Sequence, residues 1–206
     1  MRQNRTHPVA KLDFFYEFAS TYSYPAAMRI DDLALDYDVE VNWRPFLLGP
    51  IFKAQGWETS PFNIYPEKGR YMIRDLERVS EAQGLPNFRM PKAFPAYSIL
   101  PARVALCFKG EMRAAFSRAV YDAEFAQGAD ISDVKVIGKI LKMLGEDAAA
   151  IFEKVNSQPI KDALRKETEA AQKRGVFGAP AFVTADGELF WGNDRLEMAM
   201  EWAAKG

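Results

Sequence analysis

The sequence predicts an α/β protein in which both ends of the chain contribute to one small sheet and a long helical insertion separates them. Three observations predict this layout: strand-like segments at both ends of the chain, a helical apolar pattern from 68 to 174, and a hairpin signal at Asp186-Gly187. Neither end has enough strands to bury a sheet alone. The two ends are therefore expected to pair around the inserted helices.

The opening segment reads as strand, turn, helix and strand. Residues 11–18 are rich in aromatic side chains, which is typical of a buried strand. A small polar turn at 19–21 follows, and apolar residues then recur at helical spacing from Tyr22 to Tyr37. Residues 39–48 alternate as in a second strand. A unit of this length predicts a parallel pair with a right-handed crossover.

The middle of the chain changes character after the second strand. Glycine and proline in residues 50–66 predict an irregular loop, and the apolar spacing from 68 to 174 predicts helices. Gly145 is expected just past the end of one of these helices. Pro159 fits the first helical position of a later one, and Gly175 the position just past its end.

The final segment returns to strand character. Asp186-Gly187 lies between two short apolar runs, 181–184 and 189–191, and predicts a tight hairpin. A last helix is expected from about Arg195 to Ala204. Asp194 and Glu197 have the spacing of a capping box at its start.

Composition excludes several classes of function. The 206 residues are 49% hydrophobic and 27% charged, with a formal net charge of −1. A balanced charge gives no attraction to nucleic acid or anionic lipid. No run approaches the ~20 apolar residues of a membrane span, and the first residues lack the apolar core of a signal peptide. We expect a cytoplasmic protein with no nucleic-acid or membrane partner.

The chain has one cysteine, Cys107, and one histidine, His7. One cysteine cannot form an intrachain disulfide or a CxxC redox pair, and two such residues are too few for a Cys/His zinc site. We therefore expect no metal, and Cys107 is expected to pack in the core. A nucleophile, if the protein uses one, is expected to arrive with a cofactor.

The predicted element order is the layout of a thioredoxin fold with a helical insertion. It divides the chain into a discontinuous thioredoxin-like domain, 1–66 with 175–206, and an inserted helical domain, 67–174. This layout points to two places for chemistry: the start of the first helix and the loop before the third strand.

The first place contains Ser20-x-x-Ser23, where redox thioredoxins carry two cysteines. A helix N-terminus attracts anions because its amide groups are unpaired and its dipole is positive there. The Ser20 hydroxyl could donate a hydrogen bond to a thiolate supplied by another molecule. The alternative is that Ser20 only caps the helix, a role that serine favours.

The second place contains Ala179-Pro180, directly before a predicted strand. A trans proline is the default, but in a thioredoxin fold a cis proline lies here and exposes the backbone of the preceding residue to a peptide-like ligand. A third candidate is Gly192-Asn193-Asp194. Its polar groups could hold the amino-acid end of a ligand, or Asp194 could simply cap the last helix.

These segments carry a resemblance. Val176-Phe177-Gly178-Ala179-Pro180 and Trp191-Gly192-Asn193-Asp194-Arg195-Leu196 resemble the C-terminal signature of 2-hydroxychromene-2-carboxylate isomerases, and Ser20-Thr21-Tyr22-Ser23 is similar to their Ser-Pro-Tyr-Ser, which kappa-class glutathione transferases share. The resemblance spans essentially the whole chain. It implies a DsbA-like fold, glutathione as cofactor, a small aromatic carboxylate as substrate, and a homodimer.

The resemblance also implies roles for individual residues. Ser20 would orient the glutathione thiolate and act in catalysis, and Ala179, beside Pro180, would pair with the cysteinyl backbone. The γ-glutamyl end and a carboxylate of glutathione would be held by Gly192, Asn193, Asp194 and Lys68.

One departure concerns the loop after Gly56. Trp57 stands where family members often carry a cofactor-contacting asparagine, and Asn63 is a candidate substitute. Asn63 and Lys53 are also the candidates for contact with an acidic substrate.

The implied activity is a glutathione-dependent isomerisation of a hydroxychromene carboxylate to an open benzylidenepyruvate. Addition of a thiolate would give the transient single bond that rotation requires. Two alternatives stay open: a kappa-type transferase or peroxidase acting on other electrophiles, and a noncatalytic thioredoxin-like module that binds peptides beside Pro180. A disulfide oxidoreductase is disfavoured because the cysteine pair is absent.

Overall fold

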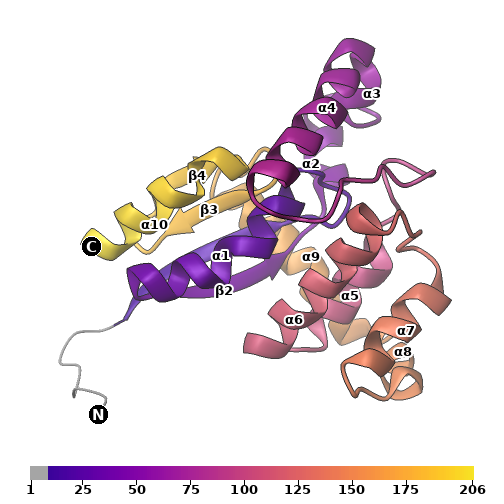
Figure 1. The fold of residues 1–206 in the computed structure, drawn as a ribbon. Coiled ribbons are helices and arrows are strands. Elements are labelled where there is room, and N and C mark those ends of the chain that lie inside the picture. The colour runs from indigo at the N-terminus through magenta and orange to yellow at the C-terminus, as the bar shows by residue number, and fades with distance from the viewer. Residues whose placement is uncertain (1–8) are drawn as a thin grey trace.

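The computed structural model describes residues 9–206, so His7 lies outside the described residues. Strands and helices follow the order expected at both ends of the chain (Figure 1). The elements are β1 (Ala10–Tyr16), α1 (Ser23–Tyr37), β2 (Val39–Pro45), α2 (Leu48–Ala54), α3 (Pro61–Ile64), α4 (Pro66–Ala82), α5 (Ile99–Leu106), α6 (Gly110–Tyr121), the π-helical segment η1 (Asp122–Ala126), α7 (Val134–Met143), α8 (Ala148–Val155), α9 (Gln158–Lys173), β3 (Ala181–Thr184), β4 (Leu189–Trp191), the 3₁₀ segment η2 (Asn193–Arg195) and α10 (Leu196–Lys205).

The sheet is mixed, with strand order β2-β1-β3-β4. β1 and β2 are parallel, whereas β1 with β3 and β3 with β4 are antiparallel. The two ends of the chain therefore meet along β1 and β3, where Phe14 lies opposite Phe182. This pairing confirms the predicted thioredoxin-like layout with a helical insertion.

Alternate residues of β1 point to opposite faces of the sheet. Phe14 and Tyr16 belong to the larger apolar core, which also contains residues of α1, α6 and α10, and Figure 1 shows α1 and α10 together on one face. Phe15 belongs to a smaller core on the other face, together with Ala171 of α9 and Ile51 of α2. The sheet is thus covered by helices on both faces.

The helical insertion packs directly on the sheet. The hydroxyl groups of Tyr16 in β1 and Ser117 in α6 are hydrogen-bonded at 2.7 Å, and both residues are fully buried. The division at 66/67 and 174/175 stays a prediction. Part of the first predicted segment, residues 1–8, lies outside the described residues.

The expectation of an irregular loop over 50–66 is wrong, because α2, α3 and the start of α4 occupy it. Pro61 and Pro66 each lie in the first turn of a helix, where the missing proline N–H would have no intrahelical partner. Ser60 caps α3 by accepting a hydrogen bond from the Phe62 N–H. The prolines therefore start helices here rather than prevent them.

The predicted capping box at the last helix is also wrong. α10 begins at Leu196 after the 3₁₀ segment, and no side chain caps it. Asp194 instead pairs with Arg195, and Glu197 pairs with Arg29 of α1. The helix-ending roles of Gly145 and Gly175 are confirmed, since their φ angles are 79° and 76°.

Two further sequence expectations bear on function. Within residues 9–206, no helix is both long and apolar enough to cross a membrane, and no cluster of potential metal ligands occurs. Cys107 is half-buried against the larger core and carries no disulfide, and burial raises the pKa of its thiol.

Candidate functional site

Ser20 lies in the turn that joins β1 to α1. Its Oγ donates a hydrogen bond to the carbonyl oxygen of Ala179 at 2.9 Å, although 159 residues separate the two in sequence. The N-terminal cap of α1 is Tyr22, which makes no capping hydrogen bond through its side chain. The alternative that Ser20 merely caps the helix is therefore wrong, and its hydroxyl faces the loop before β3.

The start of α1 has the features of an anion site. The amide groups of Thr21 and Tyr22 donate to no acceptor among residues 9–206, and the first turn of α1 contains no acidic residue. The partial positive charge of this 15-residue helix is therefore not neutralised by its own side chains. A thiolate beside Ser20 would meet both the helix end and a hydroxyl donor.

The Ala179–Pro180 peptide bond is cis. In the described part of the chain the Ala179 N–H has no acceptor, and its carbonyl oxygen accepts only from Ser20. A free donor and an accessible acceptor on one residue are what an extended peptide pairs with when it binds along a strand edge. The resemblance implies that Ala179 pairs with a ligand backbone, and this role stays a prediction.

The Gly192-Asn193-Asp194 segment is joined to the same loop. The Gly192 N–H donates to the Pro180 carbonyl oxygen at 3.0 Å. Gly192 has φ 109°, and a Cβ there would lie 2.5 Å from Asp194 Oδ1, so only glycine fits without displacing that carboxylate. Three segments far apart in sequence, at Ser20, Ala179 and Gly192, thus form one hydrogen-bonded series.

Arg29 of α1 holds Asn193 in place, a role that the sequence did not suggest. Its Nη2 donates to the Asn193 backbone oxygen at 2.7 Å, its Nε donates to Asn193 Oδ1 at 3.3 Å, and its Nη1 pairs with Glu197. Asn193 is buried, whereas the Asp194 carboxylate is exposed beside Arg195. The Asp194 carboxylate is therefore the acidic group of this segment that solvent or a ligand ammonium group can reach, beside its ion pair with Arg195.

We expect Arg29→Met to weaken the glutathione binding that the resemblance implies by about 5- to 10-fold, since a charge-assisted hydrogen bond contributes roughly 1.5–3 kcal/mol and relaxation absorbs part of the loss. Titration calorimetry with reduced glutathione measures the change. Arg74→Met is the matched control, because Arg74 is exposed and pairs only with Glu77 of its own helix. Equal affinities in both variants would show that the Arg29 contacts do not support the ligand site.

Lys68 lies on the helix that packs against the Ser20 turn. Thr21 Oγ1 donates to Met72 Sδ at 3.1 Å, and the Tyr22 hydroxyl donates to Asp75 at 2.9 Å. Lys68 is four residues before Met72, so both lie on the same face of α4. The Lys68 side chain is exposed, and its ammonium group lies 4.8 Å from the centre of the Tyr65 ring. It is thus one helical turn beyond the contact with the Ser20 turn.

The remaining predicted site residues are not joined to Ser20 by any contact within residues 9–206. Lys53 is exposed on α2, and Asn63 is exposed on α3 and donates to Thr59 at 3.1 Å. Trp57 packs on Phe52, with ring centroids 5.6 Å apart. The side chains of Asn63 and Trp57 are thus engaged within their own loop, although Phe62, next to Asn63, lies 6.4 Å from Tyr22 between ring centroids.

A buried carboxyl group lies beneath the turn and was missed by sequence reasoning. Glu17 is only 5% exposed, and its carboxylate accepts hydrogen bonds from the Ser98 hydroxyl and the Ala19 N–H. Burial raises the pKa of Glu17 to about 7, although both hydrogen bonds oppose the shift. The Glu17 backbone oxygen accepts from the Ser20 N–H and from the Tyr121 hydroxyl, each at 2.9 Å. The Ser20 turn is therefore anchored from below.

A second buried acid, Glu124, lies in the π-helical segment η1. It is fully buried, and neither of its carboxyl oxygens has a hydrogen-bond partner among the described residues. Burial, and then the negative charge of Glu17, raise the pKa of Glu124 well above its ordinary value. Single-turn π segments are frequent at functional sites. The signal in the sequence was an acid directly before a phenylalanine within an apolar stretch, Glu17 before Phe18 and Glu124 before Phe125.

Comparisons with known proteins match this geometry. The family model of the DSBA-like thioredoxin domain matches residues 11–201. The chain is 33% identical over 191 residues to 2-hydroxychromene-2-carboxylate isomerase of Sphingobium xenophagum, covering 90% of this chain and 94% of the relative. It is 27% identical over 201 residues to human glutathione S-transferase kappa 1, covering 91% and 88%.

Solved structures agree with the sequence relatives. A 2-hydroxychromene-2-carboxylate isomerase superposes with a TM-score of 0.84 at 27% identity, covering 95% of each chain. A probable DsbA oxidoreductase from Streptomyces coelicolor superposes with a TM-score of 0.73 at 16% identity, covering 95% of this chain and 89% of the other. The similarity to the DsbA oxidoreductase, at 16% identity, concerns the fold alone.

Proposed function

Since the chain belongs to the DSBA-like thioredoxin domain family, and within it to the 2-hydroxychromene-2-carboxylate isomerases and their kappa-class transferase relatives, we propose that it is a glutathione-dependent isomerase of small aromatic carboxylates. The observation that carries the proposal is the position of the Ser20 hydroxyl. It stands at the amino end of α1, facing the cis Ala179–Pro180 loop at 2.9 Å, where a redox thioredoxin would have its own thiol.

The residues present fit glutathione. The unpaired Ala179 N–H and its carbonyl oxygen would pair with the cysteinyl backbone, and Pro180 would fix that edge. The exposed Asp194 carboxylate would receive the γ-glutamyl ammonium group, beside Gly192 and Asn193. Lys68 would reach a glutathione carboxylate from α4.

Glutathione, when bound, supplies the thiolate whose reversible addition to a conjugated substrate permits rotation about a former double bond. The task of the protein is to keep that thiol ionised near neutral pH, although a free thiol titrates near 8.5. Ser20 Oγ can turn from Ala179 to donate to the sulfur, and the free amides of α1 add positive potential. A charge-assisted hydrogen bond contributes roughly 1.5–3 kcal/mol, which lowers the thiol pKa by about one to two.

The direct test follows the interconversion of 2-hydroxychromene-2-carboxylate and its benzylidenepyruvate isomer with three additions: buffer, reduced glutathione, and S-methylglutathione. We expect turnover only with reduced glutathione, and inhibition by S-methylglutathione, which has the same backbone but no ionisable thiol. Turnover in buffer alone at the same rate would refute the proposal.

A kappa-type transferase is the second candidate, because the same cradle for a thiolate would serve other electrophiles. What supports it is the 27% identity to human glutathione S-transferase kappa 1 over 91% of this chain, together with Trp57, which alters the loop that borders the predicted substrate cavity. Conjugation of glutathione to an aryl halide, measured beside the isomerase assay, separates the two activities. The homodimer and the cytoplasmic location implied by the sequence stay predictions.

We expect Lys68→Gln to raise the dissociation constant of glutathione by about 2- to 5-fold with little change in turnover at saturation, because an exposed ion pair contributes up to about 1 kcal/mol. Calorimetric titration and saturation kinetics measure the two effects separately. The control is Lys139→Gln, which removes an exposed lysine from α7. If Lys68→Gln changed neither the affinity nor the kinetics, the assignment of Lys68 would be wrong.

A further inference from the structure

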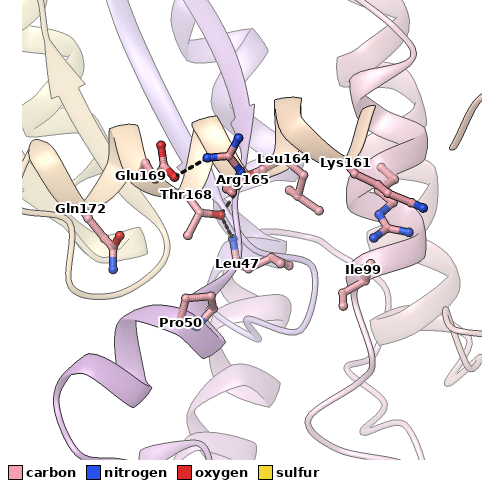
Figure 2. Close-up of a pocket in the computed structure, with 10 residues that line it drawn as sticks. Leu47, Pro50, Ile99, Lys161, Leu164, Arg165, Thr168, Glu169 and Gln172 are labelled. Atoms are coloured by element: carbon pink, nitrogen blue, oxygen red, sulfur yellow. Dashed lines mark hydrogen bonds and ion pairs between the residues drawn. The ribbon is translucent and has the colours of Figure 1, made fainter. Parts of the chain in front are cut away.

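A groove of about 350 Å³ lies between α2, α5 and α9, apart from every residue assigned to glutathione (Figure 2). Its size is that of a small-ligand pocket. Its walls come from the segment after β2, from the first turns of α5, and from one face of α9. Lys161 and Ile99 lie at one end and Gln172 at the other.

The floor of the groove is apolar. Leu47 and Ile99 are half-buried, Leu164 is 3% exposed, and all three face the groove. The one hydroxyl of the lining, on Thr168, already accepts from the Leu47 N–H at 3.2 Å and donates to the Leu164 carbonyl oxygen at 3.0 Å. The floor can therefore pack against a flat apolar ring, and its one hydroxyl group needs no hydrogen bond from a ligand.

Two cations at one end have no partner. Arg103 Nε is buried and forms no hydrogen bond with any described residue. Lys161 forms no ion pair within residues 9–206. Both side chains line the groove, so an anionic ligand there would meet two cations that no carboxylate of the described residues neutralises. Arg165 is different, because Asp162 and Glu169 already neutralise it.

The other end of the groove has side chains that can accept a hydrogen bond. Glu169 accepts from Arg165 at 3.0 Å and retains a second carboxylate oxygen, and Gln172 offers an amide that makes no side-chain hydrogen bond to the described residues. The groove thus runs from a cationic end, over an apolar floor, to an end that can accept a hydrogen bond.

We propose that this groove is a binding site for a small hydroxylated aromatic carboxylate, separate from the glutathione site. The carboxylate would lie at Arg103 and Lys161 and the ring on Leu47, Ile99 and Leu164, with the hydroxyl group on the side of the ring toward Glu169. Charge and apolar surface together favour this ligand class. A neutral aromatic ring would leave Arg103 without an anionic partner, and an inorganic anion would leave the apolar floor exposed to water. The proposal does not depend on the proposed isomerase activity.

The test uses the full chain without glutathione and trans-2-hydroxycinnamate as the probe, with titration calorimetry at low salt and neutral pH. We expect Arg103→Gln to weaken binding by about 10-fold or more and Lys161→Gln by about 3-fold, in line with a buried and an exposed charge-assisted contact. Lys166→Gln is the matched control, because Lys166 is an exposed lysine of α9 that does not line the groove.

Two further probes locate the contacts. The methyl ester of the probe is expected to bind at least about 10-fold more weakly than the acid to the wild-type chain, but only about 3-fold more weakly to Arg103→Gln, where Lys161 alone still meets the carboxylate. Since Arg103→Gln could disturb α5, Lys161→Gln is the decisive variant for an exposed position. No binding of the acid to the wild-type chain, or equal affinity in Lys161→Gln and Lys166→Gln, overturns the proposal. Neither result bears on glutathione binding.

Discussion

Replacing Ser20 by alanine is expected to lower glutathione-dependent turnover by about 10- to 100-fold while changing the dissociation constant of glutathione by less than about threefold, because the lost interaction is one charge-assisted hydrogen bond of roughly 1.5–3 kcal/mol to the thiolate. The hydroxyl donates to the Ala179 carbonyl oxygen at 2.9 Å, so it already lies beside the place proposed for the glutathione sulfur. The tripeptide backbone would still be held by Ala179 and the Gly192-Asn193-Asp194 segment.

The same variant makes a spectroscopic prediction. The pKa of the bound glutathione thiol, followed by the ultraviolet absorbance of the thiolate as a function of pH, is expected to rise by about one to two in Ser20→Ala. Turnover at high pH should then recover toward the wild-type value, because the thiol ionises there without the help of the hydroxyl. Recovery at high pH separates a role in ionisation from a general loss of structure.

Ser23→Ala is the matched control, since it removes a hydroxyl from the same turn and the same sequence pattern. Ser23 is fully buried in the first turn of α1 and cannot meet a ligand. We expect the thiol pKa and the turnover of Ser23→Ala to stay close to wild type. Loss of turnover in Ser23→Ala equal to that in Ser20→Ala would mean that the turn, not the Ser20 hydroxyl, is responsible.

The sequence predicted the fold well because its signals were local and strong. The aromatic run of β1 and the hairpin at Asp186-Gly187 have the periods of strands, and the β-helix-β unit allowed one handedness. The pairing of β1 with β3 followed from the need to bury both ends. The contact of Ser20 with Ala179 could be anticipated only because the fold brings these two segments together.

The parts that failed have two causes: a local cap that composition does not reveal, and contacts between residues distant in sequence. The start of α3 depends on a Ser60 cap and on proline in a first turn, which composition alone reads as a loop. Arg29 is an ordinary helical arginine until Asn193 and Glu197 are placed beside it. The groove of Arg103 and Lys161 needs three helices in register, and no local pattern reports that arrangement.

The buried carboxyl groups make the unfolding free energy depend on pH, with a defined sign. Glu17 has a pKa of about 7 in the folded chain against an ordinary value of 4.5, because burial disfavours its ionised form. Between these values the folded state binds more protons than the unfolded state, so the unfolding free energy falls as pH rises. The loss attributable to Glu17 is about 3 kcal/mol above pH 7, at roughly 1.4 kcal/mol per tenfold change.

Glu17→Gln is therefore expected to be more stable than the wild type above pH 7, by up to about 3 kcal/mol, and similar to it below pH 4.5. The amide resembles the protonated acid: its oxygen can accept from the Ala19 N–H, and its NH₂ can donate to the Ser98 hydroxyl. Urea unfolding at several pH values measures the difference. Glu201→Gln, which alters an exposed glutamate of α10, should follow the wild-type curve at every pH.

Glu124 also contributes to the pH dependence of the unfolding free energy. Its pKa is also raised well above the ordinary value, by burial and then by Glu17, so removing the Glu17 charge relieves Glu124 as well. We expect the double variant Glu17→Gln, Glu124→Gln to gain less than the sum of the two single variants, because each substitution removes the same repulsion. A Glu17→Gln curve parallel to the wild type across the whole pH range would contradict the burial of an ionisable group beneath the Ser20 turn.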